Sequence, residues 1–465
     1  MKRKRTSEGR SFGLVIFFLA ALVGLVVLGV KVFSQEAPAI QLMNHVKAIG
    51  KSTEIRVQVS DPEHRVKSVS MRVEQQGKLF KLPLTITVAE TPSTSWWEFW
   101  ASREPSRWTV VAHAGQKEIP ALRQGKARLV ITAVNNSWGR FFRGGRSVVS
   151  LNWPVRFSPP QIYVLTTQNN VTEGGCAMVV FRVSQGTVSS GVQVGPYFFR
   201  SFPMPRAKHD TRLCLFAYPY GTSPSTPARL VARDDAGNVT VANFNYRVLP
   251  RKFHRGKILL THAFMERLVP PIMSETPQLK NQGSLLKNFL EINRRLRQID
   301  TALLFKYGQE TTHHFLWSKP FLALPHSKVE ADYGDARSYF YHGHVVDHEV
   351  HLGYDLASVA HAPIPAANNG KVVFTGYLGI FGNAVILNHG CGLETLYGHL
   401  SRIDVKPGEM VKRGQTIGHT GETGLALGDH LHFGVLLDGI QVDPIEWWDP
   451  HWLNDQILMK LTADR

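Results

Sequence analysis

Four residues near the C-terminal end of the chain have the types and spacing of a metal-dependent hydrolase site. His351 precedes Asp355 by four positions, and His430 and His432 flank a single leucine. Residues two apart point to the same face of a strand, so His430 and His432 should face one cleft. His351 and Asp355 share a face on a regular strand, and a bend at Gly353 would also let them converge. Two imidazoles and one carboxylate can hold a catalytic zinc while leaving a coordination position open for water.

A fifth candidate, His399, lies between these two motifs in the segment Leu-Tyr-Gly-His-Leu. The segments around all five residues resemble those of the lysostaphin/LytM-type zinc metallopeptidases, which are peptidoglycan endopeptidases with a compact antiparallel β fold. The resemblance covers roughly the last third of the chain. In chain order, the similar segments are His351–Ala357, Gly382–Gly390, Leu393–Leu400, Val405–Gly418 and Thr420–Phe433.

The resemblance implies a role for each of the five residues. His351, Asp355 and His432 would bind one zinc ion per chain, and His399 and His430 would be unligated catalytic imidazoles. Histidine titrates in the range that proton transfer at neutral pH requires. We expect His430 to be the general base and His399 to stabilise the transition state, although the sequence is equally compatible with the exchanged roles.

The similar segments also contain departures from the family pattern. Gly434 stands where many relatives carry Glu, so a partner that orients a metal ligand is either missing or supplied from elsewhere. Asp429 and Cys391 replace other common residues, but neither change removes a proposed ligand. Cys391 is expected close to the metal cleft, where its thiolate is a further candidate ligand that the set does not need.

Other histidines near the site are given simpler interpretations. The segment His348-Glu-Val-His351 is one residue too short for the helical His-Glu-x-x-His zinc motif. We expect His342 and His344 to lie on a polar loop at the rim of the cleft. The tandem His313 and His314 are expected to serve packing or to lie on the surface.

The N-terminal segment is predicted to anchor the chain in a membrane. Residues 1–10 form a basic tail and residues 11–33 are almost entirely apolar. About 20 residues at about 1.5 Å each span roughly 30 Å, the thickness of the bilayer hydrocarbon. The basic tail places the N-terminus in the cytoplasm. The alternative is a cleaved signal peptide, but the apolar stretch is longer than usual and Val32–Glu36 is a poor cleavage site.

The next part of the chain is predicted to form two β-sandwich modules, at residues 36–155 and 156–250. Short apolar-polar alternations recur there, as in Glu54–Val59 and Ser68–Val73, and turn signals separate them. This pattern is typical of sandwiches, and a weak internal repeat suggests two immunoglobulin-like modules. A chance similarity between two β domains is the alternative.

Residues 251–320 are predicted to be helical, because apolar residues recur there at three- and four-residue steps. Ser284 is a candidate N-cap at the start of the stripe. The apolar face should pack on the catalytic domain; direct contact with substrate is the less favoured role. Strands resume in the peptidase domain at residues 321–450, and residues 451–465 form a tail. The predicted fold is therefore multidomain and mainly β.

The formal net charge of +17 favours an anionic partner. Peptidoglycan stem peptides carry free carboxylates, and a membrane surface is also anionic. Nucleic acid is excluded as a partner because the anchor would place the charge outside the cytoplasm and no nucleic-acid motif is present. General solvation by scattered charges is the simpler alternative.

Three cysteines are too few for a disulfide-based scaffold. Cys176 and Cys214 should lie on two strands of the second module. In an oxidising compartment they would form one bridge, and otherwise they are two buried thiols.

These features together predict a single-pass protein of the inner (cytoplasmic) membrane, with most of the chain in the periplasm. It would hydrolyse peptide cross-links of peptidoglycan, with the β modules acting as a spacer, as a cover over the cleft or as a contact for a cell-envelope protein. One alternative is a catalytically silent regulator that binds and activates a separate cell-wall amidase. Another is a structural tether, but retention of all five residues argues against both.

Overall fold

The computed structural model describes most of the chain after the N-terminal segment. The predicted anchor at residues 11–33 lies outside the described residues except for Leu22, and no helix among the described residues is long and apolar enough to cross a membrane. Strands dominate the regular structure, which confirms the prediction of a mainly β protein. The described residues are 22, 37–44, 46–61, 66–88, 106–136, 144–207 and 210–463. The chain divides into two compact units, Met1–Pro159 with Asp234–Asn238, and Pro160–Arg233 with Val239–Arg465.

The first unit contains two four-stranded antiparallel sheets around one apolar core. The buried residues alternate along β2, where Ile55, Val57 and Val59 face the core, as the period of a half-buried strand requires. The immunoglobulin-like topology stays a prediction. One sheet has the order β1 (Ala39–Leu42), β2 (Thr53–Asp61), β6 (Ser106–Ala114), β5 (Leu84–Val88), and the other β4 (Lys78–Lys81), β3 (Val66–Gln75), β7 (Gly125–Asn135), β8 (Arg146–Val155).

The second unit begins with another pair of four-stranded sheets and a short parallel pair of strands. Their buried residues belong to the same core as Trp317, Tyr397 and Trp447 of the C-terminal part, so the second sandwich and the peptidase region form one body. The first sheet is β14 (Phe202–Pro203), β15 (Thr211–Ala217), β11 (Cys176–Val183), β9 (Ile162–Val164), the second is β13 (Tyr197–Arg200), β12 (Thr187–Val194), β16 (Ala228–Asp234), β17 (Val239–Ala242), and the pair is β10 (Val171–Thr172), β18 (Val248–Leu249).

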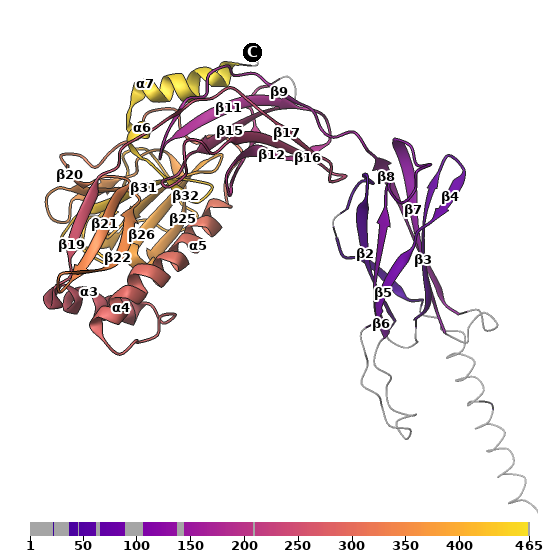
Figure 1. Ribbon diagram of the computed structural model, residues 1–465, viewed down its shortest axis with the longest axis horizontal. Helices are drawn as coiled ribbons and strands as arrows, with labels where there is room; N and C mark the ends of the chain where they lie inside the picture. Colours follow the sequence, from indigo (N-terminus) through magenta and orange to yellow (C-terminus); the bar gives the residue numbers. More distant parts are fainter. Residues whose placement is uncertain are drawn as a thin grey trace, which may run out of the picture. The chain divides into compact units, whose positions relative to one another are not determined.

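A long antiparallel sheet forms the centre of the C-terminal part (Figure 1). Its order is β20 (Lys328–Ala331), β23 (Tyr354–Ala357), β31 (Leu431–Leu437), β27 (Leu393–Gly398), β26 (Asn383–Gly390), β25 (Gly370–Tyr377), β29 (Met410–Val411), with β32 (Ile440–Val442) paired to β31. A second sheet contains β19 (Arg255–Leu259), β21 (Asp335–Tyr341) and β22 (His344–His351), and a third contains β24 (Pro363–Pro365), β30 (Thr416–His419) and β28 (Arg402–Ile403).

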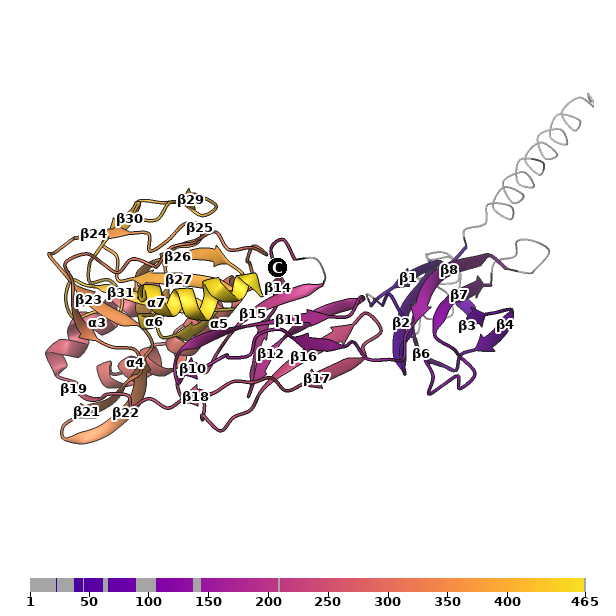
Figure 2. The same ribbon diagram turned by 90° about the horizontal axis from the view of Figure 1, so that it is seen from above.

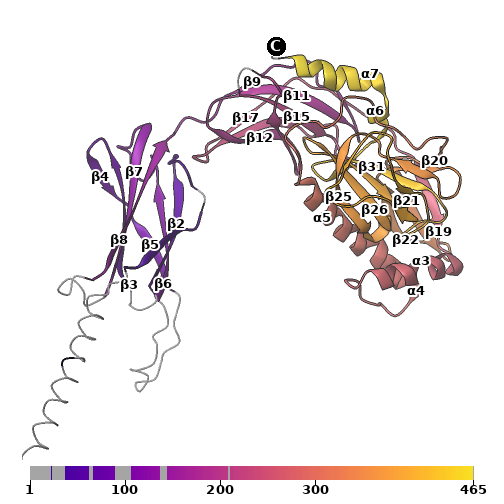
Figure 3. The same ribbon diagram turned by 180° about the vertical axis from the view of Figure 1, so that it is seen from behind.

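Helices from the predicted helical segment cover one side of the long sheet (Figure 3). They are α3 (His262–Glu275), α4 (Leu285–Glu291), the π-helical turn η2 (Ile292–Leu296) and α5 (Arg297–Gly308). The Ser284 side chain accepts a hydrogen bond from the backbone N–H of Lys287, which confirms the predicted N-cap of α4. Phe289 and Leu296 of the apolar stripe share a core with Ile386 of the sheet.

The last described part of the chain, residues 445–462, is helical and packed. It contains α6 (Ile445–Trp448), α7 (Pro450–Leu453), η4 (Asn454–Leu458) and η5 (Met459–Thr462). Figure 2 shows this helical run beside the second sandwich. Leu453 and Ile457 are buried, and the Lys460 ammonium donates a hydrogen bond to the carbonyl oxygen of Met178 at 2.9 Å.

The cysteines are free thiols and none lies at the metal cleft. Cys176 pairs with Ala217 and Cys214 pairs with Val179, so the two thiols lie three residue pairs apart along β11 and β15. That separation is too long for a disulfide, and the alternative of two buried thiols is confirmed. Cys391 lies in the β26–β27 turn, at the end of β27 that is remote from His399. Its expected place near the metal cleft is therefore wrong, because the strand separates the turn from that residue.

Candidate metal centre and active site

Three strands bring the predicted metal ligands together. His351 is the last residue of β22, Asp355 lies in β23, and His432 lies in β31. Asp355 and His432 are directly opposed in the β23–β31 pair. His351 reaches them because the chain bends between β22 and β23, at Leu352 and Gly353. Of the two predicted arrangements for His351 and Asp355, a regular strand or a bend at Gly353, the structure therefore has the bend.

Gly353 is required at this bend because the chain passes very close to a ligand. A Cβ atom at this position would lie 2.5 Å from Cε1 of His432, and 2.8 Å from the carbonyl oxygen of Phe433. Both distances are shorter than real contacts allow. A side chain here would displace the imidazole of His432 or the strand that carries it.

The three ligand atoms lie within hydrogen-bonding distance of one another. His351 Nε2 is 2.9 Å from Asp355 Oδ1 and 3.1 Å from His432 Nδ1. His432 Nδ1 is also 3.1 Å from Asp355 Oδ1. His351 Nδ1 lies 3.0 Å from the carbonyl oxygen of Asp332, which makes that nitrogen a donor and leaves Nε2 to face the cluster. Two nitrogens and one carboxylate oxygen converging in this way fit a zinc ion.

A second pair of imidazoles lies beside this cluster. His399 Nδ1 and His430 Nδ1 each lie 2.8 Å from a backbone carbonyl oxygen, of Thr423 and Gly428 respectively. Both nitrogens therefore act as donors, and both Nε2 atoms remain for chemistry. The ring centroids of His399 and His430 are 4.8 Å apart, and His430 Nε2 is 3.5 Å from Asp355 Oδ1.

His399 is held in an unusual backbone conformation. Its φ angle is +66°, in the left-handed region that residues with a side chain rarely adopt. The Phe381 carbonyl oxygen, at 2.7 Å, accepts a hydrogen bond from the His399 N–H. Such strain persists only where the surroundings enforce it, and it is concentrated at functional sites.

Burial and close charges separate the pKa values of the groups in the cluster. Burial would raise the pKa of Asp355, but His351, His430 and His432 hold it well below its usual range. Burial lowers the pKa of His432 to about 4 and that of His399 to about 3. Burial would also lower the pKa of His430, yet the Asp355 carboxylate raises it above the ordinary value. Asp355 is therefore a buried negative charge surrounded by imidazoles.

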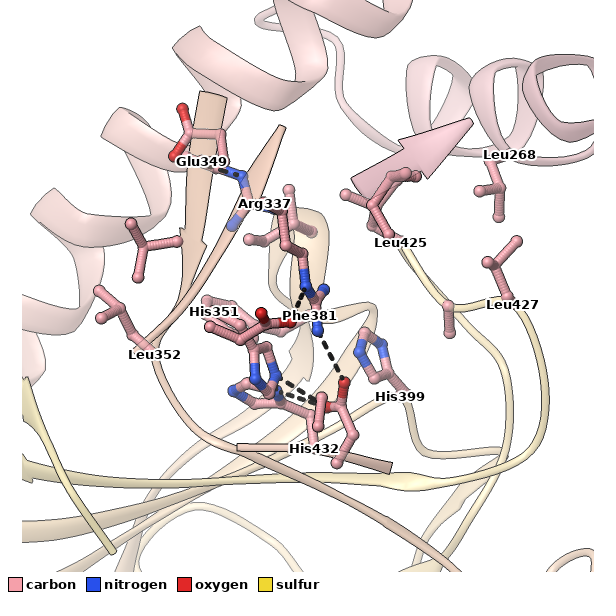
Figure 4. Close-up of a pocket in the computed structure, with 18 of the residues that line it drawn as sticks. Leu268, Arg337, Glu349, His351, Leu352, Phe381, His399, Leu425, Leu427 and His432 are labelled. Atoms are coloured by element: carbon pink, nitrogen blue, oxygen red, sulfur yellow. Dashed lines mark hydrogen bonds and ion pairs between the residues drawn. The ribbon is translucent and has the colours of Figure 1, made fainter. Parts of the chain in front are cut away.

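A cavity of about 380 Å³ opens at the cluster. We call its strand side the floor, which comprises His351, Asp355, His399, His430 and His432. We call its other side the roof, which comprises Phe264, Leu268, Phe289, Arg297, Asp300, Thr301, Arg337 and Tyr339. Figure 4 shows Leu268, Leu425 and Leu427 on one side of the cavity and Arg337 extending toward the histidines.

The roof is the part of the site that sequence reasoning missed. The helical segment was expected to pack on the catalytic domain, and it does so. It also lines the cavity through Phe264, Leu268 and Thr301. No motif marks these residues. Arg337, a charged residue before the ligand segment, is likewise not part of a motif.

The other histidines considered in the sequence do not line the cavity. His342 and His344 are exposed at the β21–β22 turn and are not among the residues that line the cavity, so their predicted place at its rim is wrong. The hairpin points this turn away from the end that carries His351. His348 lies on a strand, which agrees with rejection of the helical zinc motif. His313 is exposed and packs its ring on Phe202, with 5.8 Å between the ring centroids.

Comparison with known proteins identifies the family of the C-terminal region. Residues 349–444 match the model of peptidase family M23. The chain is 35% identical over 124 residues to the DD-carboxypeptidase/endopeptidase Mpg of Neisseria meningitidis serogroup B, a match that covers 26% of this chain and 27% of Mpg. It is 43% identical over 96 residues to the peptidoglycan DD-endopeptidase ShyC of Vibrio cholerae, which covers 21% of this chain and 22% of ShyC.

A solved structure is similar to part of the chain. The catalytic domain of the antimicrobial peptidase lysostaphin from Staphylococcus simulans is 30% identical, with 27% of this chain and 94% of that domain covered and a TM-score of 0.23. The chain spans 27% of the length of Mpg and 22% of ShyC. All five residues of the floor lie inside the matched segment. Residues 349–444 of this chain are therefore a peptidase family M23 domain.

Proposed function

We propose that the protein is a zinc endopeptidase that hydrolyses peptide cross-links of peptidoglycan. The observation that carries the proposal is the convergence of His351, Asp355 and His432 within 3.1 Å of one another, beside two further imidazoles and an open cavity. The names of the relatives specify DD-endopeptidases. We therefore propose bonds between D-configured centres as the target.

Each floor residue has a task in this reaction. His351, Asp355 and His432 would hold a zinc ion, which when bound would supply a Lewis acid and lower the pKa of bound water to about 7. His430 and His399 both present Nε2 with Nδ1 already donated, so either can accept a proton there. We assign His430 as the base. His399 is assigned to stabilise the oxygen that gains negative charge, a role that requires a hydrogen on its Nε2.

We also propose that residues 11–33 anchor the chain in the inner membrane, with the sandwiches and the peptidase domain in the periplasm. The support is the basic tail followed by an apolar stretch long enough to span a bilayer. The sandwiches would then set the distance between the membrane and the substrate.

The test is digestion of isolated peptidoglycan by the purified full chain in detergent, with and without a chelator, followed by mass spectrometry of the released fragments. Chelator-sensitive loss of cross-linked dimers is expected, and the fragments identify the bond. Absence of hydrolysis under all conditions, together with stimulation of an added cell-wall amidase, would replace the enzyme by the regulator.

A further inference from the structure

Arg337 connects the roof to the metal cluster. It lies on β21, before the segment that matches the peptidase family, and its side chain points into the cavity (Figure 4). Its Nη2 is 3.6 Å from Asp355 Oδ2, and its Nε donates to Asp335 Oδ2 at 3.0 Å. The Arg337 side chain is 21% exposed, so water screens these contacts only weakly.

The surroundings of Arg337 hold it in place. Its strand is paired on both sides, in parallel with β19 and antiparallel with β22. Asp335, which accepts the Nε hydrogen bond, is itself 2.7 Å from His254 Nδ1. The guanidinium is therefore fixed by the backbone and by a second carboxylate, and it does not depend on Asp355 for its position.

The two oxygens of Asp355 face different groups. Oδ1 lies 2.9 to 3.1 Å from the nitrogens of His351 and His432, whereas Oδ2 faces Arg337. A carboxylate can rotate and exchange its oxygens, and a cation fixed on one of them opposes this rotation. The same cation also offsets the cost of a buried negative charge.

The three ligands differ in the support that they receive. His351 is oriented by the Asp332 carbonyl oxygen, and Asp355 is contacted by Arg337. The Nε2 atom of His432 is buried and has no hydrogen-bond partner among the described residues. Gly434 lies beside this nitrogen and has no side chain to offer. Support from outside the ligand set is thus concentrated on His351 and Asp355.

We propose that Arg337 is a positioning residue for metal binding, which holds Asp355 with Oδ1 directed at His351 and His432. This inference rests on the proposed zinc site. Partners that orient metal ligands typically contribute 10- to 100-fold to metal affinity. Arg337→Gln should therefore raise the zinc dissociation constant of the full chain by about 10- to 100-fold. Arg337→Lys keeps the charge but not the planar fork, and should recover part of the loss.

The experiment measures zinc affinity by competition with a chromogenic chelator, and thermal melting of the metal-free protein. Arg294→Gln is the matched control. Arg294 makes an ion pair at 3.0 Å with Asp347, which lies on the hairpin that carries Arg337, but Arg294 does not line the cavity. The absorption spectrum of the cobalt-substituted protein reports ligand geometry directly, and it should change in Arg337→Gln and stay unchanged in Arg294→Gln.

The two proposals fail in different ways. If the wild-type protein binds zinc and both Arg337 variants bind it equally well with an unchanged cobalt spectrum, the positioning role is overturned and the zinc site stands. If the wild-type protein binds no zinc, the proposed function is overturned, and the positioning role with it. A loss of affinity in Arg337→Gln that exceeds the loss in Arg294→Gln, at equal melting temperature, supports the inference.

Discussion

The floor and the roof of the cavity are built from different kinds of sequence. The floor consists of polar donors on strands β22, β23 and β31 and in the loops beside them, all within residues 351–432. The roof consists mainly of helices α3 to α5 and strand β21, and it mixes apolar residues with Arg297, Asp300, Thr301 and Arg337. The floor carries a recognisable motif because metal chemistry restricts which side chains can serve. The roof residues come from separate elements and form no motif of fixed residue types and spacing.

The floor and the roof each contain one buried carboxylate, and the two carboxylates differ in their surroundings. Asp355 of the floor is surrounded by imidazoles, and its pKa is held well below the usual range. Burial raises the pKa of Asp300 in the roof to about 7, since the Ile380 N–H and the Arg297 charge only partly oppose it. Its Oδ1 has no hydrogen-bond partner among the described residues. Asp355 is thus suited to bind a cation, whereas Asp300 serves to hold the loop that contains Ile380.

The largest expected effect is at a floor ligand. His432→Ala should abolish zinc retention and hydrolysis, because one of three ligands is lost, with little change in folding of the metal-free protein. Metal analysis, peptidoglycan digestion and circular dichroism measure the three properties. His344→Ala, at an exposed position on β22, is the control. Full activity of His432→Ala would show that the ligand assignment is wrong.

A floor residue that is not a ligand should separate metal binding from catalysis. His399→Ala removes an imidazole whose Nε2 faces the cluster but leaves all three ligands in place. We expect zinc to be retained and the rate to fall on the order of 10²–10³-fold, the usual loss for one donor to an oxyanion. Zinc content and kcat are measured on the same samples. Loss of zinc in parallel with activity would place His399 among the ligands.

A roof substitution should change stability and leave zinc affinity intact. The pKa of Asp300 is raised from 3.8 to about 7, so its neutral form is favoured in the folded state. The contribution of Asp300 to the free energy of unfolding is complete below about pH 4 and is lost as pH rises through 7. The reason is that the unfolded chain releases the proton at a lower pH than the folded chain does. Asp300→Asn should remove this loss of stability, which is on the order of 3 kcal/mol between about pH 4 and pH 7.

Denaturant titrations of metal-free protein from pH 4 to 8 test the roof prediction. The wild-type protein should lose stability relative to Asp300→Asn across this interval. Asp210→Asn changes an exposed carboxylate and should keep the wild-type profile. Parallel profiles for the wild-type protein and Asp300→Asn would show that Asp300 is not a buried neutral acid.

The smallest expected effect concerns the unsupported ligand. A Cβ at Gly434 would lie 3.4 Å from Leu396 Cβ and 4.0 Å from His432 Nε2, which leaves room for a small side chain. The hydroxyl of Gly434→Ser can accept a hydrogen bond from Nε2, and we expect zinc affinity to rise by up to about tenfold. Gly353→Ala should lower zinc affinity, because its Cβ would lie 2.5 Å from Cε1 of the same imidazole. Equal zinc affinities of Gly434→Ser and Gly353→Ala would show that a hydrogen bond to His432 Nε2 does not affect metal binding.

The sequence alone determined much of the floor and the general class of the fold. The resemblance to the lysostaphin/LytM-type peptidases singled out His351, Asp355 and His432 as ligands, and the structure brings these three residues together. Residue types carried this information because zinc accepts few donors, and the glycine bend made their convergence plausible. Apolar alternation predicted the mainly β architecture, and Ser284 marked the start of a helix.

Tertiary structure decided what these elements pack against. Periodicity shows which face of a helix is apolar but not which surface will cover it, so the helices could not be assigned to the roof. The sequence likewise did not show that the second sandwich and the peptidase domain share one core. It also did not show the strand register that keeps Cys176 and Cys214 apart. Arg337 reaches Asp355 only because β21 pairs with β22, the strand that ends in His351. Contacts between strands depend on register, and register is fixed when the whole sheet forms.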